Sequence, residues 1–286
     1  DHEQQRAEVV AWTPVSGSYD LTGVWGQTVV SPVDNLVLTA GVRHDEHSEF
    51  GGHTTYRGTA SYLFEELGTR LHSSIGTGFR APSLAELYES PSGNPNLRPE
   101  TSTNFDFGVE QTFLEGRIIA DATYFQIDVD DQIVSRWPSP YEQISGTTRS
   151  RGLEASIAYA ATDWLDIAGS YTYTDSRRES GERNFYVPRH AFVLSASIRP
   201  AEKWTVSADL KYVSDTVGVV FPPPSYAQTR IALDNYALLN AKVAYQLSES
   251  TEIYLRGENL LNENYQTVAG YGTPGISAFA GIKAKF

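Results

Sequence analysis

The feature that most constrains the fold of this chain is a period of two in the placement of its apolar residues. In the stretch KWTVSADLKYV, the side chains of Trp204, Leu210 and Tyr212 fall on one side of an extended backbone. Those of Ser207 and Asp209 fall on the other side. The same alternation returns in segment after segment, and each such segment predicts a strand whose two faces meet different media.

Thirteen strands are expected from this alternation. They span residues 18–31, 35–46, 53–64, 68–79, 101–113, 116–130, 147–160, 164–175, 188–199, 202–214, 231–247, 251–261 and 275–286. Short turns alternate with longer loops, which span residues 47–52, 80–100, 131–146, 176–187, 215–230 and 262–274. Short turns at one end and long loops at the other are typical of outer-membrane barrels. A soluble sandwich has no reason to sort its loops in this way.

Aromatic residues on the apolar face indicate which medium it meets. Trp204 and Tyr212 are eight residues apart, which gives about 19 Å of height for a strand tilted by about 45°. This is close to the height of a lipid band with an aromatic residue at each border. No stretch approaches the roughly 18 apolar residues of a transmembrane helix. The sequence therefore predicts an all-β fold, a transmembrane antiparallel β-barrel with Asp209 and Lys211 facing a wet lumen.

Composition and motifs exclude several classes of function. The chain has 22 basic and 35 acidic residues, and this balance argues against a nucleic-acid partner, which would require a basic face. Motifs for dinucleotide binding, calcium binding and hydrolysis are missing, so we expect no enzymatic activity, no catalytic residue and no cofactor. His44, His47 and His53 offer a possible metal site on an outer loop. Their spacing matches no standard site, so a solvated loop is favoured.

Four segments carry a resemblance to a known family. The stretch GTGFRAPSLAELYESPSGNPNLRPETSTNFDFGVEQ, from Gly76 to Gln111, resembles a hallmark segment of TonB-dependent outer-membrane receptors. SRGLEASIAY from Ser150, VPRHAF from Val187 and ENLLNENYQTVAGYGTPG from Glu258 are similar to further segments of that family, in the same order. The piece from Tyr265 to Tyr271 is most similar to vitamin B12 (cobalamin) receptors, while siderophore receptors share much of the rest.

The resemblance implies uptake of a small molecule, such as cobalamin, across the outer membrane of a Gram-negative bacterium. Family members have an N-terminal plug and a barrel of 22 strands. We expect residues 1–17 to be the remnant of an extracellular loop and residues 18–286 to be the C-terminal part of such a barrel. No plug and no TonB-contacting segment (TonB box) are found in the sequence. The implied partners are the TonB complex, acting through the missing plug, outer-membrane lipid and lipopolysaccharide, and the barrel-assembly machinery.

Other functions remain open at this point. One alternative is a receptor for a ferric siderophore complex, and another is a passive channel or a purely structural barrel. An outer-membrane enzyme would need a catalytic group that the sequence does not provide.

Candidate ligand contacts are aromatic and polar side chains in the long loops, because aromatic rings give rigid contact area with one polar handle. They are Tyr88, Arg98, Trp137, Tyr141, Tyr226 and Tyr271. Packing within the loops is the alternative for each. The motifs that begin at Arg80 and Asn94 are rich in proline and are expected to fix loop geometry. At the C-terminus, Phe286 follows Ala284 and Ile282 at two-residue intervals, which resembles the signal read by barrel-assembly machinery.

Overall fold

The computed structural model describes residues 2–9, 15–136 and 139–285, and strands form most of its regular structure. Fourteen strands form one sheet, in which hydrogen-bonded neighbours follow the order of the chain. They are β1 (His2–Val9), β2 (Val15–Val30), β3 (Leu36–His47), β4 (Gly51–Phe64), β5 (Thr69–Arg80), β6 (Glu100–Phe113), β7 (Ile118–Asp130), β10 (Thr147–Thr162), β11 (Leu165–Arg177), β12 (His190–Ala201), β13 (Trp204–Ser214), β16 (Tyr236–Ser248), β17 (Thr251–Glu258) and β18 (Ser277–Ala284). All thirteen expected strands are present, and β1 adds a fourteenth.

The remaining elements lie in the connections. The longer ones contain the helix α1 (Leu84–Tyr88) and two hairpins, formed by β8 (Ile133–Arg136) with β9 (Ser139–Gln143) and by β14 (Thr216–Val220) with β15 (Thr229–Leu233). Two short turns contain the 3-10 helices η1 (Glu65–Leu67) and η2 (Leu114–Gly116). Within the described ranges no helix is long and apolar enough to cross a membrane.

Several boundaries differ from expectation by a few residues, for example at β17, which ends at Glu258 and not at residue 261. Two differences change the element to which a stretch belongs. Residues 231–233 belong to β15, and the strand of the large sheet begins only at Tyr236, because Asp234 and Asn235 interrupt the extended run. Residues 1–17 contain β1 and the start of β2. These two strands pair antiparallel, from His2 opposite Thr22 to Val9 opposite Val15. Their assignment to an extracellular loop stays a prediction.

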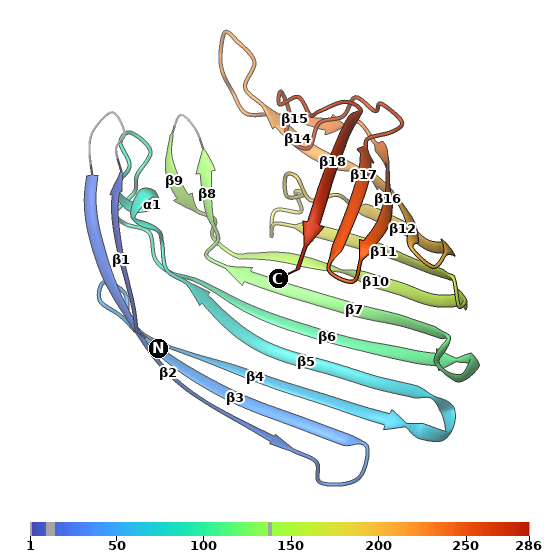
Figure 1. The fold of residues 1–286 in the computed structure, drawn as a ribbon. Helices are drawn as coiled ribbons and strands as arrows, with labels where there is room; N and C mark the ends of the chain where they lie inside the picture. The colour runs from blue at the N-terminus through green and yellow to red at the C-terminus, as the bar shows by residue number, and fades with distance from the viewer. Residues whose placement is uncertain (1, 10–14, 137–138, 286) are drawn as a thin grey trace. The chain divides into compact units, whose positions relative to one another are not determined.

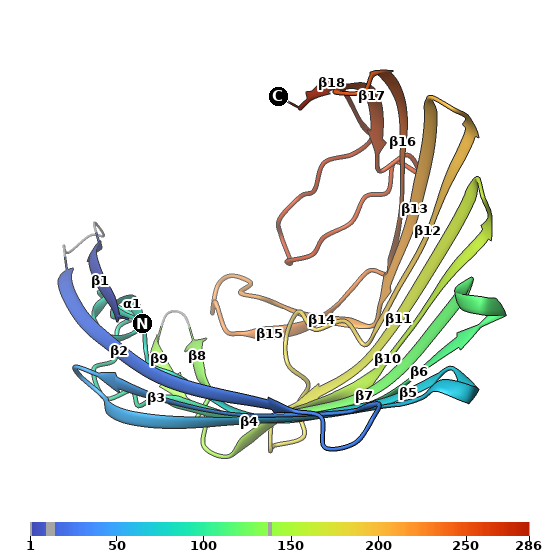
Figure 2. The same ribbon diagram turned by 60° about the horizontal axis from the view of Figure 1, so that its bottom comes forward.

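The chain divides into two compact units. Unit 1 comprises residues 1–108, 125–151 and 176–182, and unit 2 comprises residues 109–124, 152–175 and 183–286. In unit 1, β3, β4 and β5 run side by side (Figure 1). In unit 2, β12, β13, β16, β17 and β18 succeed one another along the sheet (Figure 2).

The strands of unit 2 have one apolar and one polar face, as the sequence predicts. On the apolar face Leu210 lies opposite Leu194 of β12 and Leu239 of β16. On the polar face the Asn240 amide donates a hydrogen bond of 2.8 Å to the Asp209 carboxylate. An outer-membrane barrel alternates in this way between lipid and lumen, so the face of Leu210 is the one that meets lipid.

The same division holds in unit 1 along β3. Leu38 lies opposite Ala60 and Val42 lies opposite Tyr56, so the even-numbered residues of β3 share the apolar, lipid-facing side. The odd-numbered residues share the inner side, and near the end of the strand Asp45 and His47 are buried. The inner side is therefore covered at this end of unit 1.

Candidate functional site

The loop between β5 and β6, residues 81–99, is built around α1 and is called the α1 loop below. Its helix begins with a capping box: the Glu86 main-chain N–H donates to the Ser83 hydroxyl at 3.2 Å, and the Ser83 main-chain N–H donates to the Glu86 carboxylate at 2.7 Å. After the helix, a Cβ at Gly93 would meet main-chain atoms of residues 87–89 at 2.7–2.8 Å. Only glycine fits there, so the chain turns closely against α1.

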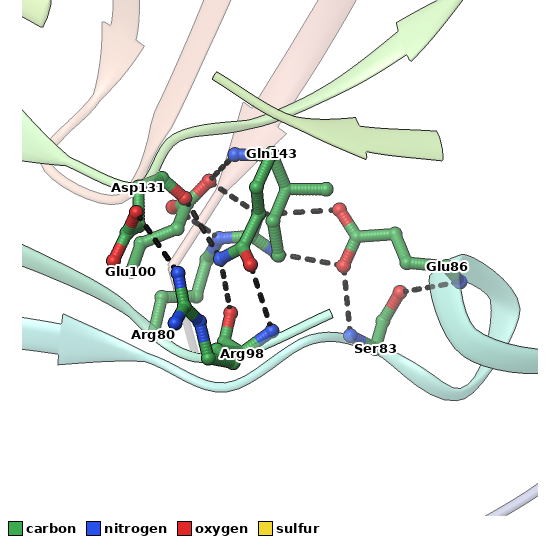
Figure 3. Close-up of polar contacts among 8 residues, drawn as sticks. Arg80, Ser83, Glu86, Arg98, Glu100, Asp131 and Gln143 are labelled. Atoms are coloured by element: carbon green, nitrogen blue, oxygen red, sulfur yellow. Dashed lines mark hydrogen bonds and ion pairs between the residues drawn. The ribbon is translucent and has the colours of Figure 1, made fainter. Parts of the chain in front are cut away.

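Arg80 joins the two ends of the α1 loop (Figure 3). Its guanidinium donates to the Glu100 carboxylate at 2.8 Å and to the Glu86 carboxylate at 2.9 Å. The hydrogen bonds with Glu100, followed by those with Glu86, raise the pKa of Arg80 further above its usual range. Burial alone would raise the pKa of Glu86, but its contacts with Arg80 and Ser83 lower it overall. One guanidinium therefore binds both carboxylates.

A small apolar core lies under the α1 loop. Leu87, Leu97 and Ile133 are buried against one another, and the rings of Phe50 and Tyr141 pack on this cluster. Burial, together with the negative charges of Glu89 and Glu86, raises the pKa of Tyr141. The core therefore joins α1 to the β8–β9 hairpin and holds the ring of Tyr141 within it.

Hydrogen bonds between side chains and the main chain reinforce this junction. The Gln143 side chain accepts from the Arg98 N–H at 3.0 Å and donates to the Arg98 carbonyl at 2.6 Å. The Asn94 amide donates to the Tyr141 carbonyl at 2.8 Å. The Arg98 guanidinium itself is exposed and reaches Asp131 at 3.4 Å. The motif that begins at Asn94 thus fixes loop geometry, as its composition indicates.

The histidines near the β3–β4 turn do not lie on a solvated loop, so that prediction was wrong for His47. The His47 side chain is 2% exposed, because its ring stacks on Tyr19 with centroids 4.6 Å apart and contacts Phe50 at 5.1 Å. The His53 ring stacks on Phe79 at 4.4 Å. His44 remains exposed. In the described parts of the chain, no group of three or more His, Asp or Glu side chains is arranged to hold a metal ion.

In unit 2, the loop of residues 259–276, called the Asn259 loop below, is organised by asparagine. The Asn259 amide donates to the carbonyls of Glu263 at 2.9 Å and Pro274 at 3.2 Å, and it accepts from the Glu263 N–H at 2.8 Å. Asn262 accepts from the Ile276 N–H at 3.2 Å. Both asparagines have a positive φ, which asparagine tolerates better than most residues. These side chains frame the loop, and the Tyr265 ring packs on the buried Tyr236 ring with centroids 4.5 Å apart.

Two predicted contact residues of unit 2 are strongly exposed. Tyr271 is 72% exposed and Tyr226 is 59% exposed. Tyr226 also has a φ of 51°, a conformation that is rare for a bulky residue. Its N–H donates to the Pro222 carbonyl at 3.0 Å, which closes the turn that presents the ring.

Arginines of the unit 2 loops are paired with acidic groups. Asp215 accepts from Arg183 at 2.7 Å and lies 2.8 Å from Arg189. The hydrogen bond from Arg183 and the charges of Arg183, Arg189 and His190 lower the pKa of Asp215 despite some burial. The Arg230 guanidinium lies 4.5 Å from the centre of the Phe185 ring.

The structure thus separates the predicted contact residues into groups. Arg98 and Tyr141 belong to the junction beneath the α1 loop in unit 1, and Tyr88 ends α1 with 43% exposure. Tyr226 and Tyr271 lie on separate loops of unit 2. Trp137 falls outside the described residues. Ligand contact by any of them stays a prediction.

Two features of the site were missed by sequence reasoning, the carboxylate pair of Glu86 and Glu100 and the burial of His47. The Ser83–Glu86 spacing, S-x-x-E before an apolar pair, is a readable signal for the helix start. No local signal indicates that His47 is covered, because Tyr19 lies on another strand.

At the C-terminal end, Ile282 lies opposite Ile253 on the lipid-facing side and is 73% exposed, and Ala284 lies opposite Thr251. Phe286 falls outside the described residues. Recognition of these three residues by assembly machinery stays a prediction.

Comparison with known proteins identifies the family. Residues 6–260 match the family described as TonB dependent receptor-like, beta-barrel. A vitamin B12 transporter BtuB of Vibrio cholerae is 27% identical over 237 residues, which cover 82% of this chain and 38% of the relative. A protein of the same name from Photobacterium profundum is 26% identical over 272 residues, covering 91% of this chain and 42% of the relative. The chain therefore spans about two fifths of the length of these relatives.

Solved structures with the same fold include siderophore receptors. A ferric enterobactin receptor (PfeA) mutant of Pseudomonas aeruginosa gives a TM-score of 0.77 at 18% identity, covering 96% of this chain and 46% of its own. The siderophore receptor PirA of Acinetobacter baumannii gives a TM-score of 0.80 at 16% identity. The match covers 94% of this chain and 46% of the PirA chain. At such identities the likeness shows the fold alone. Together with the family match, these findings establish that the chain belongs to the TonB-dependent receptor family of Gram-negative outer-membrane β-barrels.

Proposed function

We propose that this chain supplies barrel wall and outer loops to a receptor that takes up cobalamin or a closely similar molecule. The observation that carries the proposal is the likeness, over most of the chain, to relatives named vitamin B12 transporters. The stretch from Tyr265 to Tyr271 carries the same resemblance.

The charge state of the outer loops favours a cargo without strong negative charge. The guanidinium groups of Arg80, Arg98, Arg183 and Arg189 all have carboxylate partners. An anionic ferric siderophore would have to compete with these carboxylates for the cations. A corrin has a broad apolar face edged with amides, which tyrosine and asparagine side chains match better.

Exposed tyrosines supply the contact surface in this proposal. Tyr226 and Tyr271 are more than half exposed. Tyr88 is the third exposed tyrosine, at 43%. A tyrosine ring offers a large apolar face with a single hydroxyl and has little side-chain entropy to lose. No covalent step is involved, and the loops act by capture alone.

Transport in this proposal depends on TonB. The outer loops capture the cargo, and TonB, driven by the inner-membrane proton gradient, pulls on a plug and opens a path through the lumen. The described residues supply the wall and the loops, and the plug belongs to the wider receptor.

A ferric siderophore receptor is the second candidate, because proteins of that kind share the fold. A passive channel is the third. The distinguishing measurement is binding of cyanocobalamin and of a ferric catecholate to cells that carry the receptor, with and without TonB. Saturable cobalamin binding and TonB-dependent accumulation support the proposal.

Two variants locate the contact. Tyr271→Ala should weaken cobalamin binding about tenfold, and Tyr271→Phe, which keeps the ring, should weaken it less, because an interface aromatic contributes about 1–2 kcal/mol. Saturable binding of the catecholate without binding of cobalamin would reject cobalamin and select the siderophore receptor. Accumulation that does not require TonB would select the channel.

A further inference from the structure

His47 is a buried titratable group to which the proposed function assigns no role. It is the last residue of β3, its side chain is 2% exposed, and its ring lies between Tyr19 and Phe50. Histidine changes charge near neutral pH, so its burial between aromatic rings matters for how this region responds to acid.

One hydrogen bond defines the protonation state of His47. The Glu49 main-chain N–H donates to Nδ1 of His47 at 3.1 Å. Nδ1 must therefore carry a lone pair, and the single ring proton lies on Nε2. That Nε2 atom is buried and has no hydrogen-bond partner among the described residues. A second proton would have to enter at Nδ1, where it would face the Glu49 N–H and break this bond.

The Glu49 bond connects His47 to the α1 loop. Glu49 and Phe50 lie in the turn between β3 and β4, and the Phe50 ring packs on the buried cluster of Leu87, Leu97 and Ile133. A change in this turn therefore moves a ring that supports α1. The turn and the loop core form one continuous packed region of unit 1.

We propose that His47 is an acid-sensitive latch, whose protonation at Nδ1 breaks the Glu49 hydrogen bond, displaces Phe50 and loosens the α1 loop. At neutral pH the latch is closed because the neutral ring fits both its aromatic neighbours and the Glu49 N–H. In acid the imidazolium is stable only when the ring reaches water, so protonation favours the open loop. The response needs no cargo and does not depend on the proposed function.

The charged groups around His47 support a loss of stability in acid. Burial lowers the pKa of His47, Glu49 raises it to a smaller extent, and His53 of β4 lowers it further. From β3, Asp45 forms an ion pair with Arg43 at 2.6 Å, and from β2 the Tyr19 ring stacks on the His47 ring. On the α1 loop, the Glu86 carboxylate is paired with Arg80 at 2.9 Å. Since the pKa of His47 is lower in the folded state, stability is lost as the pH falls below the ordinary value of 6.5.

Amide hydrogen exchange of the purified receptor in detergent, without cargo, tests the latch. If the closed state excludes the proton entirely, opening of the α1 loop should increase up to about 30-fold between pH 7.5 and 5.0, after correction for the intrinsic exchange rate. The amides of residues 84–98 should show this change, while those of the Asn259 loop should not.

Variants assign the effect to His47. His47→Asn retains an oxygen that can accept from the Glu49 N–H but cannot titrate. After correction for the intrinsic exchange rate, the opening of its α1 loop should therefore no longer depend on pH over this range. His44→Gln removes an exposed histidine of the same strand and should keep the full response. The proposal is overturned if the wild-type loop shows no added opening at pH 5.0. It also fails if the His47→Asn loop keeps the wild-type pH response.

Discussion

The α1 loop of unit 1 and the Asn259 loop of unit 2 are stabilised by different kinds of interaction. The α1 loop buries Leu87 and Leu97 and adds the ion pairs of Arg80. The Asn259 loop relies on asparagine side chains that bond to the main chain, while its Leu261 is 51% exposed and its Tyr271 is 72% exposed. In a loop that packs inward, the apolar side chains contact one another. In a loop framed by asparagines, apolar and aromatic side chains remain exposed and can contact another molecule.

This difference bears on where cargo contacts should be sought. Tyr141 lies in the inward-packed region and is committed to the core beneath α1. Tyr271 has no such role and is open to a partner. Two aromatic residues that look equivalent in the sequence therefore have different prospects as ligand contacts, and the Asn259 loop is the better place to begin mutagenesis.

The largest expected effect comes from the apolar core. Leu87→Ala should reduce the free energy of opening of the α1 loop by about 2–5 kcal/mol, because it leaves a cavity in a buried cluster. Amide exchange of residues 84–98 measures this loss, and the Asn259 loop should not respond. Leu261→Ala, at an exposed position, is the control and should change either loop by less than about 0.5 kcal/mol. Equal losses in both loops after Leu87→Ala would erase the distinction between them.

Removal of the Arg80 cation should have the next largest effect. Arg80→Gln leaves Glu86 and Glu100, which are 15% and 13% exposed, without their shared partner. We expect the free energy of opening of the α1 loop to fall by about 1–3 kcal/mol. This is less than for a fully buried pair, because Arg80 is itself half-exposed. Amide exchange at pH 7.5 measures the loss. Wild-type protection in Arg80→Gln would mean that the core alone holds the loop.

Acid titration checks the same ion pair in a second way. The pKa of Glu86 is lower in the folded state, so its contribution is present above the ordinary value of 4.5 and is lost as the pH falls through the folded value. The pH range of this loss lies below the range in which His47 titrates. In Arg80→Gln, the α1 loop should no longer show a step in amide protection below pH 4.5. It should retain the change in protection at higher pH that we attribute to His47.

A smaller effect is expected in the Asn259 loop. Asn259→Ala removes three side-chain hydrogen bonds and places alanine at a φ of 49°, which should cost about 1–2 kcal/mol. Asn259→Gly removes the same bonds but accepts the backbone conformation, so it should lose less. Amide exchange of residues 260–276 gives both values, and the α1 loop is the internal control. An Asn259→Ala loop as protected as wild type would show that the asparagine frame is dispensable.

Salt should produce the smallest effect and should separate the two loops most directly. Raising the salt concentration to about 1 M shortens the screening length to about 3 Å. It should lower the free energy of opening of the α1 loop by less than about 1 kcal/mol. The Asn259 loop has neutral hydrogen bonds at its base and should be unchanged. The difference in exchange between the two salt concentrations is the measurement, and a larger response of the Asn259 loop would contradict this account.

The strands could be predicted because each carries its own signal. A period of two is visible in KWTVSADLKYV without reference to any other part of the chain, and the paired register places Leu210 on the face that the alternation indicates. The loops could not be predicted to the same depth. Leu97 is buried by Ile133 from another connection, and His47 is covered by Tyr19 from another strand. Such contacts depend on which segments meet in space, and no local pattern records that.

The position of Arg80 also has a consequence for how the α1 loop can change over evolutionary time. Arg80 is the last residue of β5 and Glu100 is the first residue of β6, and the bond between them joins the loop's entry to its exit. With its ends tied together, the α1 loop behaves as a self-contained insert on the barrel wall. Substitutions between the two ends can alter the exposed surface of the loop while the strands keep their register. One arginine thus allows the sequence of the loop to vary without a change in the wall.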